Sequence, residues 1–278
     1  MVATPIGNLG DLSARACETL RTCALIAAED TRHTGVLLKH FGIETPQISL
    51  HDHNEQQRIP DFLARLRRGD CIALVSDAGT PAISDPGFDR VRAAAAAGVE
   101  VVAIPGPCAA IAALSIGALP TDRFCFEGFL PARGAARRRR LESLAAEPRT
   151  LVLYESPHRV PDMLEDCAAA FGGGRGAMLA REITKLHETA YRGSIAELAA
   201  RARTDADFSR GEIVLLIAGA PQQDAGERGA DGLGRALDRV LKILLDELPL
   251  KQAARLGALI VDARDNESYK RALHLKQE

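Results

Sequence analysis

The chain has 278 residues, of which 46% are hydrophobic and 26% are charged, values typical of a globular protein and not of a disordered or fibrous one. Lysine and arginine number 35 against 37 aspartate and glutamate, so the formal net charge is −2. This balance argues against a protein coated all over by nucleic acid, although a local basic patch remains compatible with it. Six dispersed cysteines without a CxxC pair predict reduced thiols in a cytoplasmic protein. We expect neither a secretory signal nor a membrane-spanning segment.

Short β-branched runs alternate with longer amphipathic stretches along most of the chain. The predicted strands cover residues 24–28, 71–76, 99–104, 150–154, 177–180 and 212–218. The predicted helices cover residues 12–22, 59–68, 88–97, 108–118 and 161–170. Alternation of this kind predicts α/β layers with largely parallel strand pairing.

The predicted elements divide into two groups, which we interpret as two α/β domains that meet at a cleft, over residues 1–119 and 120–221. The first strand is expected to be shortened, because Val2 and Ala3 directly precede a loop. A polar, glycine-rich stretch predicts a linker over residues 222–234. Residues 235–278 then predict a small helical module, whose helices cover 233–248, 250–263 and 266–275.

Three loops rich in glycine and proline follow strand ends, at residues 4–8, 77–87 and 105–110. In open α/β sheets, ligands bind at the carboxyl ends of the strands. Glycine lets a ligand approach the main chain, and proline fixes the loop before anything binds. Three such loops in one domain predict a binding cleft. None of them has a GxxxxGK[ST] or GxGxxG pattern, which argues against an NTPase or a nicotinamide enzyme.

Charged clusters also follow predicted strands, at residues 29–33, 155–159 and 181–188. Each could be the solvated first turn of a helix, but three in parallel positions favour a polar cleft. His51 and His53 have metal-ligand side chains without a third ligand at a suitable spacing, so we expect no metal site. The run Arg137–Arg140 enters a helix from a flexible arm. From the residues alone, it is either a phosphate-binding patch or a solvated helix start.

Seven motifs together resemble one known family. They are VATPIGNLGDL at residues 2–12, AEDTR at 28–32, SDAGTPAISDPG at 76–87, PGPCAA at 105–110, FEGFLP at 126–131, YESPHR at 154–159 and AREITK at 180–185. The chain is similar to small-subunit ribosomal RNA 2′-O-methyltransferases of the tetrapyrrole-methylase class, which use S-adenosylmethionine. The motifs span residues 2–219, and the helical tail resembles that family's helix-turn-helix-like module.

The resemblance implies a fold of two α/β domains with the cofactor in the cleft between them. It implies 2′-O-methylation of a cytidine in the decoding region of 16S rRNA, with S-adenosyl-L-methionine as donor and S-adenosyl-L-homocysteine as product. It also implies a cytoplasmic homodimer that acts on the small ribosomal subunit. Two other readings stay open: a C-methyltransferase of tetrapyrroles in cobalamin-precursor synthesis, and a non-catalytic rRNA-binding assembly factor.

Site residues follow from the resemblance position by position. It implies cofactor contacts from Ile6, Thr80, Ile83, Cys108, Ala109, Tyr154, Glu155, Arg181 and Glu182. The chain has Gly79-Thr80-Pro81 where many relatives carry Gly-Asp-Pro, so no role of that aspartate is carried over. Because a neutral hydroxyl is a weak nucleophile, we expect a general base, with Glu29, Asp30 and Glu182 as open candidates. The expected RNA contacts are Arg32, Arg137, Arg138, Arg139, Arg140, Arg159 and Lys185.

Overall fold

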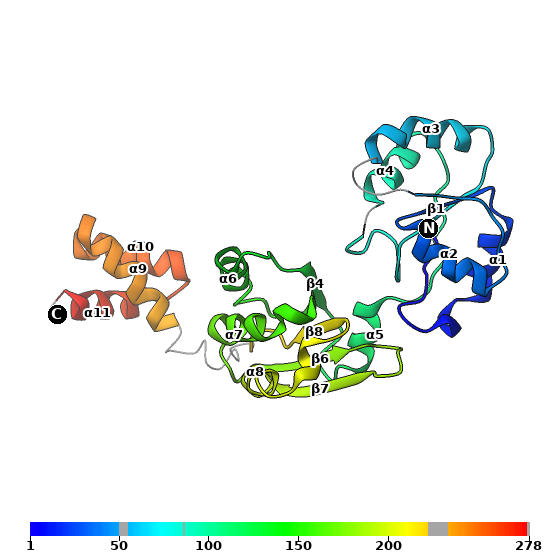
Figure 1. Cartoon of the computed structure of the whole chain (residues 1–278). Helices are drawn as coiled ribbons and strands as arrows, with labels where there is room; N and C mark the ends of the chain where they lie inside the picture. Colours follow the sequence, from blue (N-terminus) through cyan, green and yellow to red (C-terminus); the bar gives the residue numbers. More distant parts are fainter. Residues whose placement is uncertain (50–54, 86, 222–232, 277–278) are drawn as a thin grey trace. The chain divides into compact units, whose positions relative to one another are not determined.

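The computed structural model of the chain describes residues 1–49, 55–85, 87–221 and 233–276 (Figure 1). The chain forms two compact units, Met1–Ala220 and Pro221–Glu278. The pair His51 and His53 and nearly all of the predicted linker 222–234 lie outside the described residues. Among the helices of the described ranges, none is long and apolar enough to cross a membrane.

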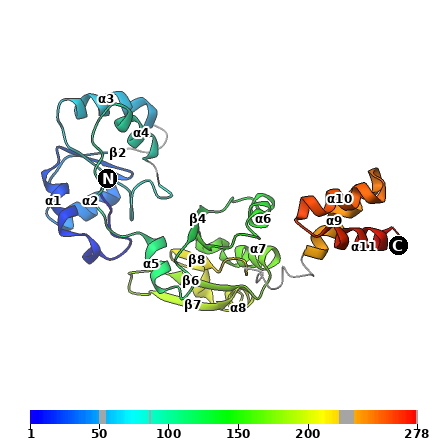
Figure 2. The ribbon, with the colours of Figure 1, turned by 180° about the vertical axis from the view of Figure 1, so that it is seen from behind.

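The first sheet of the larger unit is entirely parallel, as predicted. Its strands are β1 (Leu25–Ala28), β2 (Gln47–Ser49) and β3 (Ile72–Val75), in the order β2-β1-β3. One face is buried by α1 (Ala14–Thr22) and α2 (Thr31–His40), and the other by α3 (Glu55–Arg67) and α4 (Phe88–Ala96) (Figures 1 and 2). Helix α2, which was not predicted, begins at the charged cluster that follows β1.

The prediction of a strand over residues 99–104 is wrong. In the structure only Ile104 forms a bridge, to Val2. The Ile104 amide donates to the Met1 carbonyl at 2.8 Å, and the Ala3 amide donates to the Ile104 carbonyl at 3.2 Å. Val2 in turn donates to the carbonyl of Leu74 in β3 at 2.9 Å, so residues 1–3 lie between β3 and this segment. Neighbouring Val102 is 47% exposed, which a buried strand would not allow.

The second sheet has five strands, and most of its pairs are antiparallel. They are β4 (Phe124–Phe129), β5 (Thr150–Glu155), β6 (Gly176–Arg181), β7 (Thr189–Ser194) and β8 (Ile213–Ile217), in the order β4-β5-β8-β6-β7. Only the β4–β5 pair is parallel. The prediction of largely parallel pairing is therefore wrong for this sheet. Strand β8 is buried at every position, as strands of parallel sheets usually are. Its apolar sequence therefore does not show that it pairs in the antiparallel direction.

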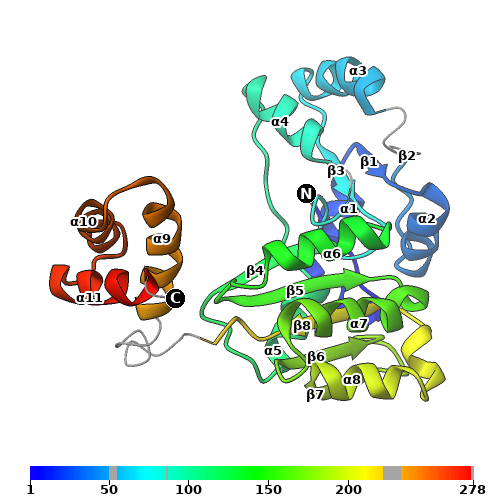
Figure 3. The same ribbon diagram turned by 90° about the vertical axis from the view of Figure 1, so that its left-hand side faces the viewer.

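Helices cover both faces of the second sheet (Figure 3). On one face lie α6 (Gly134–Ser143), α7 (Val160–Phe171) and α8 (Ile195–Ala202), which bury side chains such as Leu153 and Leu179. On the other face, α5 (Ala109–Ile116) packs small side chains against Val152 and Leu216. Short 3-10 turns cover Leu9–Asp11, Pro157–Arg159 and Ala206–Ser209.

The smaller unit contains the three helices predicted for the tail. They are α9 (Leu233–Glu247), α10 (Leu250–Val261) and α11 (Asp265–Leu275). Their core includes Leu237, Leu241 and Ala254. The buried hydroxyl of Ser268 donates to the carbonyl of Ala254 at 2.6 Å, which joins α11 to α10. The predicted domain boundaries near residues 119 and 221 stay predictions, since the larger unit contains both sheets.

Candidate functional site

A cavity of about 380 Å³ lies in the larger unit, where loops that follow both sheets meet. It is lined by residues from eight places in the chain: Ile6, Glu29, residues 77–80 with 83–85, residues 108–109, Phe129, residues 154–157, Ile183 and residues 211–214. All three glycine- and proline-rich loops contribute to it. The sequence prediction of a cleft at the strand ends is therefore confirmed as a cavity.

Backbone packed against backbone forms one wall of the cavity. Thr4 and Gly79 exchange two main-chain hydrogen bonds of 2.9 and 3.1 Å, which pair the first loop with the second. Gly79 has a φ of +81°, and a Cβ there would lie 3.2 Å from the Ile6 side chain. The Thr80 hydroxyl donates to the Pro107 carbonyl at 3.0 Å, which ties the second loop to the third. Glycine at position 79 thus permits both the turn and the close approach.

The N-terminus of α5 points to the same cavity and is joined there to the second sheet. The Ala110 amide donates to the hydroxyl of Tyr154 at 3.1 Å. This satisfies one of the free N–H groups of the first helical turn, since Cys108 supplies no side-chain cap. Burial raises the pKa of Tyr154, so its hydroxyl stays protonated. Cys108 and Ala109 line the cavity beside this junction.

Three of the carboxylate residues in the lining lie close to one another: Glu29, Asp77 and Asp85. The Asp30 amide donates to Asp77 at 3.0 Å, and the Asp77 amide donates to Glu29 at 3.5 Å. Burial, together with the nearby negative charges of Glu29 and Asp77, raises the pKa of Asp85 to about 6. A carboxyl group with such a pKa changes its charge near neutral pH, as a general base requires.

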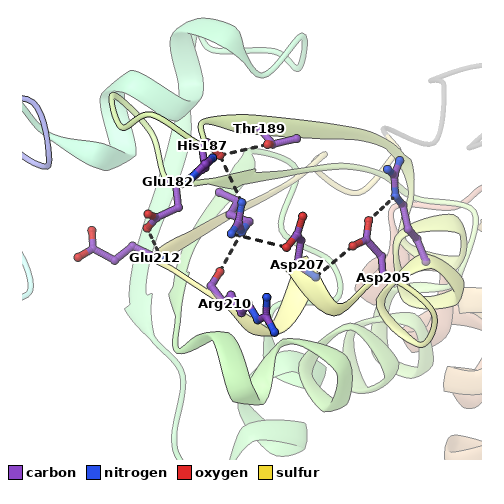
Figure 4. A network of polar contacts seen from close by, with 9 residues as sticks. Glu182, His187, Thr189, Asp205, Asp207, Arg210 and Glu212 are labelled. Carbon is purple, nitrogen blue, oxygen red and sulfur yellow. Dashed lines mark hydrogen bonds and ion pairs between the residues drawn. The ribbon is translucent and has the colours of Figure 1, made fainter.

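Seven of the nine expected cofactor residues line the cavity, namely Ile6, Thr80, Ile83, Cys108, Ala109, Tyr154 and Glu155. The structure does not bring Arg181 and Glu182 into the lining. Arg181 is buried outside the lining, and its guanidinium donates to the carbonyls of Arg210 at 3.0 Å and His187 at 3.3 Å, two residues that Figure 4 labels. These hydrogen bonds tie Arg181 to two neighbouring loops, and its expected cofactor contact stays a prediction.

Glu182 is tied to neighbours in the same network. It accepts hydrogen bonds from the Lys185 ammonium and from the Glu212 amide, both at 2.8 Å. Although partial burial acts to raise the pKa of Glu182, these donors outweigh it and lower that pKa below its usual value. The methylene chain of Lys185 covers Gly7, where any side chain would collide with it. Glu182 and Lys185 therefore fasten the 182–188 loop over the first loop, and Glu182 is a poor base.

Asp30 is also a poor base. Its carboxylate caps α2 by accepting from the Arg32 amide at 2.8 Å, and it pairs with the Arg32 guanidinium at 2.7 Å. These hydrogen bonds lower the pKa of Asp30. Of the three candidate bases, Glu29 is the one that lines the cavity. The side chain of Arg32 is 90% exposed, so it can still reach a phosphate.

The structure separates the four arginines of the basic run. Arg137 is buried and pairs with partly buried Asp166 at 2.7 Å, so the structure does not present it for the RNA contact that was expected of it. A helix that packs on the sheet must bury one position in about four, and Arg137 occupies the same face as buried Leu141. Arg140 is half-exposed and pairs with Glu127 at 2.6 Å. Arg138 and Arg139 lie exposed on the outer face.

Arg159, another expected RNA contact, joins the segment after β4 to the end of β5. Its guanidinium donates to the carbonyls of Leu130 at 3.0 Å and Pro131 at 3.1 Å, and it lies 3.2 Å from the carboxylate of Glu155. The Glu155 side chain is fully buried on the α6 and α7 side of the sheet, so burial raises its pKa above the usual value. The pair holds the 129–131 segment at the edge of the cavity.

The lining residues that sequence reasoning did not single out include Asp77, Asp85, Phe129 and Ile183. The two aspartates lie inside the second glycine-rich loop, and the interpretation of that loop rested on its glycines and prolines. The sequence feature that could have indicated them is the presence of two aspartates in one loop directly after a predicted buried strand. For Phe129 and Ile183, neither spacing nor residue type distinguishes a cavity wall from an ordinary core position.

Comparison with known proteins defines the class to which this fold and site belong. Residues 1–199 match the family described as tetrapyrrole (corrin/porphyrin) methylases, and residues 231–276 match the RsmI C-terminal HTH domain. A cobalt precorrin-4 methyltransferase has a similar structure, with a TM-score of 0.58 at 15% identity over 78% of this chain and 92% of that chain. A uroporphyrin-III C-methyl transferase from Thermus thermophilus, complexed with S-adenyl homocysteine, gives 0.52 at 17% identity over 78% and 95%.

Curated relatives narrow the assignment. Ribosomal RNA small subunit methyltransferase I of Pseudomonas aeruginosa is 53% identical over 98% of this chain and 95% of its own length. The protein of the same name in Escherichia coli is 52% identical over 98% and 93%. The chain therefore belongs to the tetrapyrrole methylase family and, within it, to the ribosomal RNA small subunit methyltransferases I.

The buried arginine of the basic run can be tested apart from its exposed neighbours. Arg137→Ala deprives the partly buried carboxylate of Asp166 of its closest partner and leaves only exposed Arg138 at 3.6 Å, so the free energy of unfolding should fall by about 3 kcal/mol. Arg139→Ala removes an exposed charge and should change it by less than about 0.5 kcal/mol. Urea unfolding of both variants measures the difference. Equal stability of the two would show that the Arg137–Asp166 pair is not structural.

Proposed function

We propose that this protein transfers a methyl group from S-adenosyl-L-methionine to the ribose 2′-oxygen of a cytidine in 16S rRNA. The observation that carries the proposal is the cavity walled by the main chain of three loops, in a chain about half identical to ribosomal RNA methyltransferases over nearly its whole length. We further propose that the substrate is the assembled small subunit in the cytoplasm and that the protein acts as a homodimer, both as the family resemblance implies.

The lining of the cavity fits the methyl donor. Ile6, Ile83, Ala109 and Val214 offer apolar surface to a flat adenine ring, while the carboxylates of the same lining suit a cationic ligand. When bound, the donor supplies a methyl group on a positively charged sulfur, which is already a strong electrophile. The protein must mainly hold the 2′-oxygen in line with that methyl group, at about 3–3.5 Å.

The geometry supports Asp85 as the general base that accepts the proton of the 2′-hydroxyl, and Glu29 lies beside it. Both side chains line the cavity, whereas Asp30 and Glu182 are held in ion pairs. Two carboxylates close together resist simultaneous ionisation, which keeps the pKa of one of them raised. Asp85 then accepts a proton more readily than an ordinary aspartate would. Such a base typically accelerates a reaction about 10²–10⁴-fold.

Exposed guanidinium groups outside the cavity suit RNA phosphates. Arg133, Arg138 and Arg139 lie on the exposed side of α6 and its approach, and Arg32 projects from the start of α2. Arginine forks bind phosphate in a bidentate manner, and each contact releases counterions. A tetrapyrrole substrate also carries negative charge, but the relatives near 50% identity are named for ribosomal RNA, and those named for tetrapyrroles lie at 15–18% identity.

One experiment tests the proposed reaction directly. Small subunits from cells that lack this modification are incubated with the protein and S-adenosylmethionine labelled in its methyl group, and the labelled nucleotide is mapped. We expect label on the 2′-oxygen of one cytidine in the decoding region. A tetrapyrrole methylated in place of RNA would overturn the proposal, as would binding of subunits without methyl transfer, which identifies an assembly factor.

Two glycines with similar backbone conformations provide a matched test of the cavity wall. Gly79 and Gly98 have φ of +81° and +72°, so an alanine at either should destabilise the fold by about 1 kcal/mol. A Cβ at Gly79 would press on Ile6, whereas around Gly98 there is open space. Gly79→Ala should therefore weaken S-adenosylmethionine binding about tenfold, and Gly98→Ala should leave it unchanged. Calorimetric titration measures both affinities, and equal values would contradict the assigned wall.

The raised pKa of Asp85 predicts a pH dependence. The rate of methyl transfer should rise with pH, reach half its plateau near pH 6, and stay level above pH 8, because the base must be deprotonated. Asp85→Asn should lower the plateau about 100-fold or more and remove the inflection. Asp89→Asn, on α4 and paired with Arg92, is the control. A near-normal rate in Asp85→Asn would eliminate Asp85 as the base.

The stability of the fold should change with pH in the direction opposite to the rate of methyl transfer. The pKa of Asp85 is higher in the folded than in the unfolded chain, so the folded state loses stability as pH rises from about 4 to 6. Above pH 7, removal of this charge by Asp85→Asn should raise the Tm by about 2–4 °C. At pH 4, where the carboxyl group is protonated in the folded protein, the two proteins should melt together.

A further inference from the structure

Phe129 is an exposed aromatic ring at the rim of the cavity. Its side chain lines the cavity, yet the residue is 55% exposed. The ring lies edge-on to Tyr154, with a distance of 5.6 Å between centroids. By contrast, the apolar floor residues Ile6, Ile213 and Val214 are all less than 10% exposed. A large apolar side chain held open to solvent at a binding cavity calls for an explanation.

A β-bulge turns this ring toward the cavity. The pairing of β4 with β5 shifts between Phe126 and Gly128, so that Gly128 lies opposite Leu153 and Phe129 opposite Tyr154. Strict alternation from Phe126 would place Phe129 on the opposite face, with Leu153. The extra residue places it on the face of Tyr154 instead. Bulges commonly re-aim a side chain beside an active site.

The residues on either side of Phe129 are held in place by packing and hydrogen bonds. Leu130, the next residue, is 3% exposed in the core, and its carbonyl accepts from the Arg159 guanidinium at 3.0 Å. On the other side, Gly128 has a φ of +61°, and a Cβ there would lie 2.9 Å from the Ser84 hydroxyl. The neighbours of Phe129 are thus fixed in the core or against the second loop. Its exposure is therefore a feature of the folded state.

From this geometry we infer that Phe129 stacks on the base of the target nucleotide and holds its ribose at the cavity. This inference rests on the proposed function, because it assumes an RNA substrate. Proteins that recognise single-stranded RNA stack unpaired bases on aromatic side chains, and enzymes that modify a nucleotide draw it out of its stack. The described lining of the cavity contains two aromatic residues, Phe129 and Tyr154, and of these Phe129 is the exposed one.

The surroundings of the ring favour the substrate over the methyl donor. Phe129 is followed within four residues by exposed Arg133, and then by the exposed Arg138 and Arg139 on α6. One short segment therefore presents an aromatic face and then phosphate-binding groups, in the arrangement that an RNA strand requires. A small molecule seated on the floor is surrounded by the buried residues, while a macromolecule that arrives from solvent meets the rim first.

Substitution of Phe129 tests the inference with readouts for each ligand. We compare Phe129→Ala, Phe129→Tyr and wild type, using undermethylated small subunits as substrate and calorimetric binding of S-adenosylhomocysteine. Phe129→Ala should raise the KM for small subunits about tenfold, in line with the loss of one base–aromatic stack. Its affinity for S-adenosylhomocysteine should change less than twofold, and Phe129→Tyr should behave like wild type on both measurements.

Phe124→Ala is the matched control, because Phe124 begins the same strand, is 39% exposed and lies outside the described lining of the cavity. It should leave both measurements unchanged. A wild-type KM in Phe129→Ala would overturn the stacking role, and weakened S-adenosylhomocysteine binding would assign the ring to the donor instead. Both results presuppose that the wild type methylates small subunits. Failure of the wild type would overturn the proposed function as well, so the two failures are distinguishable.

Discussion

The hydrogen bond from the Ala110 amide to the Tyr154 hydroxyl joins the two halves of the site. Helix α5 follows directly from the third loop, and its small side chains pack on the second sheet beside Val152 and Leu216. The same helix therefore ends one wall of the cavity and covers the sheet that carries the other. Because alanines let the helix approach the sheet closely, the loops of the first sheet reach the strand ends of the second.

Negative side chains line the cavity at this junction, and arginines lie outside it. Inside the cavity the carboxylates of Glu29, Asp77 and Asp85 face a site that suits a cationic donor. Outside the lining, buried Arg137 and Arg181 and partly buried Arg159 pair with carboxylates or donate to carbonyls, and Arg159 and Arg181 fix segments next to the cavity. Buried guanidinium groups must be paired, because an isolated charge in the core is costly. Arginines that remain in solvent are the ones available to RNA.

Particular residues show how far sequence reasoning reached. The three glycine- and proline-rich loops were predicted to form a cleft, and Gly79 with its φ of +81° shows why glycine is required there. Seven of nine expected cofactor positions line the cavity, while the charged pair Arg181 and Glu182 is turned into a network behind it. A charged residue that follows a strand gives the same sequence pattern whether its side chain faces a ligand or a neighbouring loop. Asp85 was overlooked for a related reason, since the environment that raises its pKa comes from residues far away in the chain.

By itself, the sequence determined many local features of this protein: the buried strands β1, β3, β5, β6 and β8, the turns that need glycine or proline, the three tail helices and the motifs that identify the family. These depend on neighbouring residues and on side-chain periodicity, which the sequence states directly. Only the tertiary structure decided the direction of the strands in the second sheet, which arginines are buried, and where the ring of Phe129 points. Each of these depends on contacts between segments distant in the chain, and for β4 on a single extra residue that reverses the face of every side chain after it.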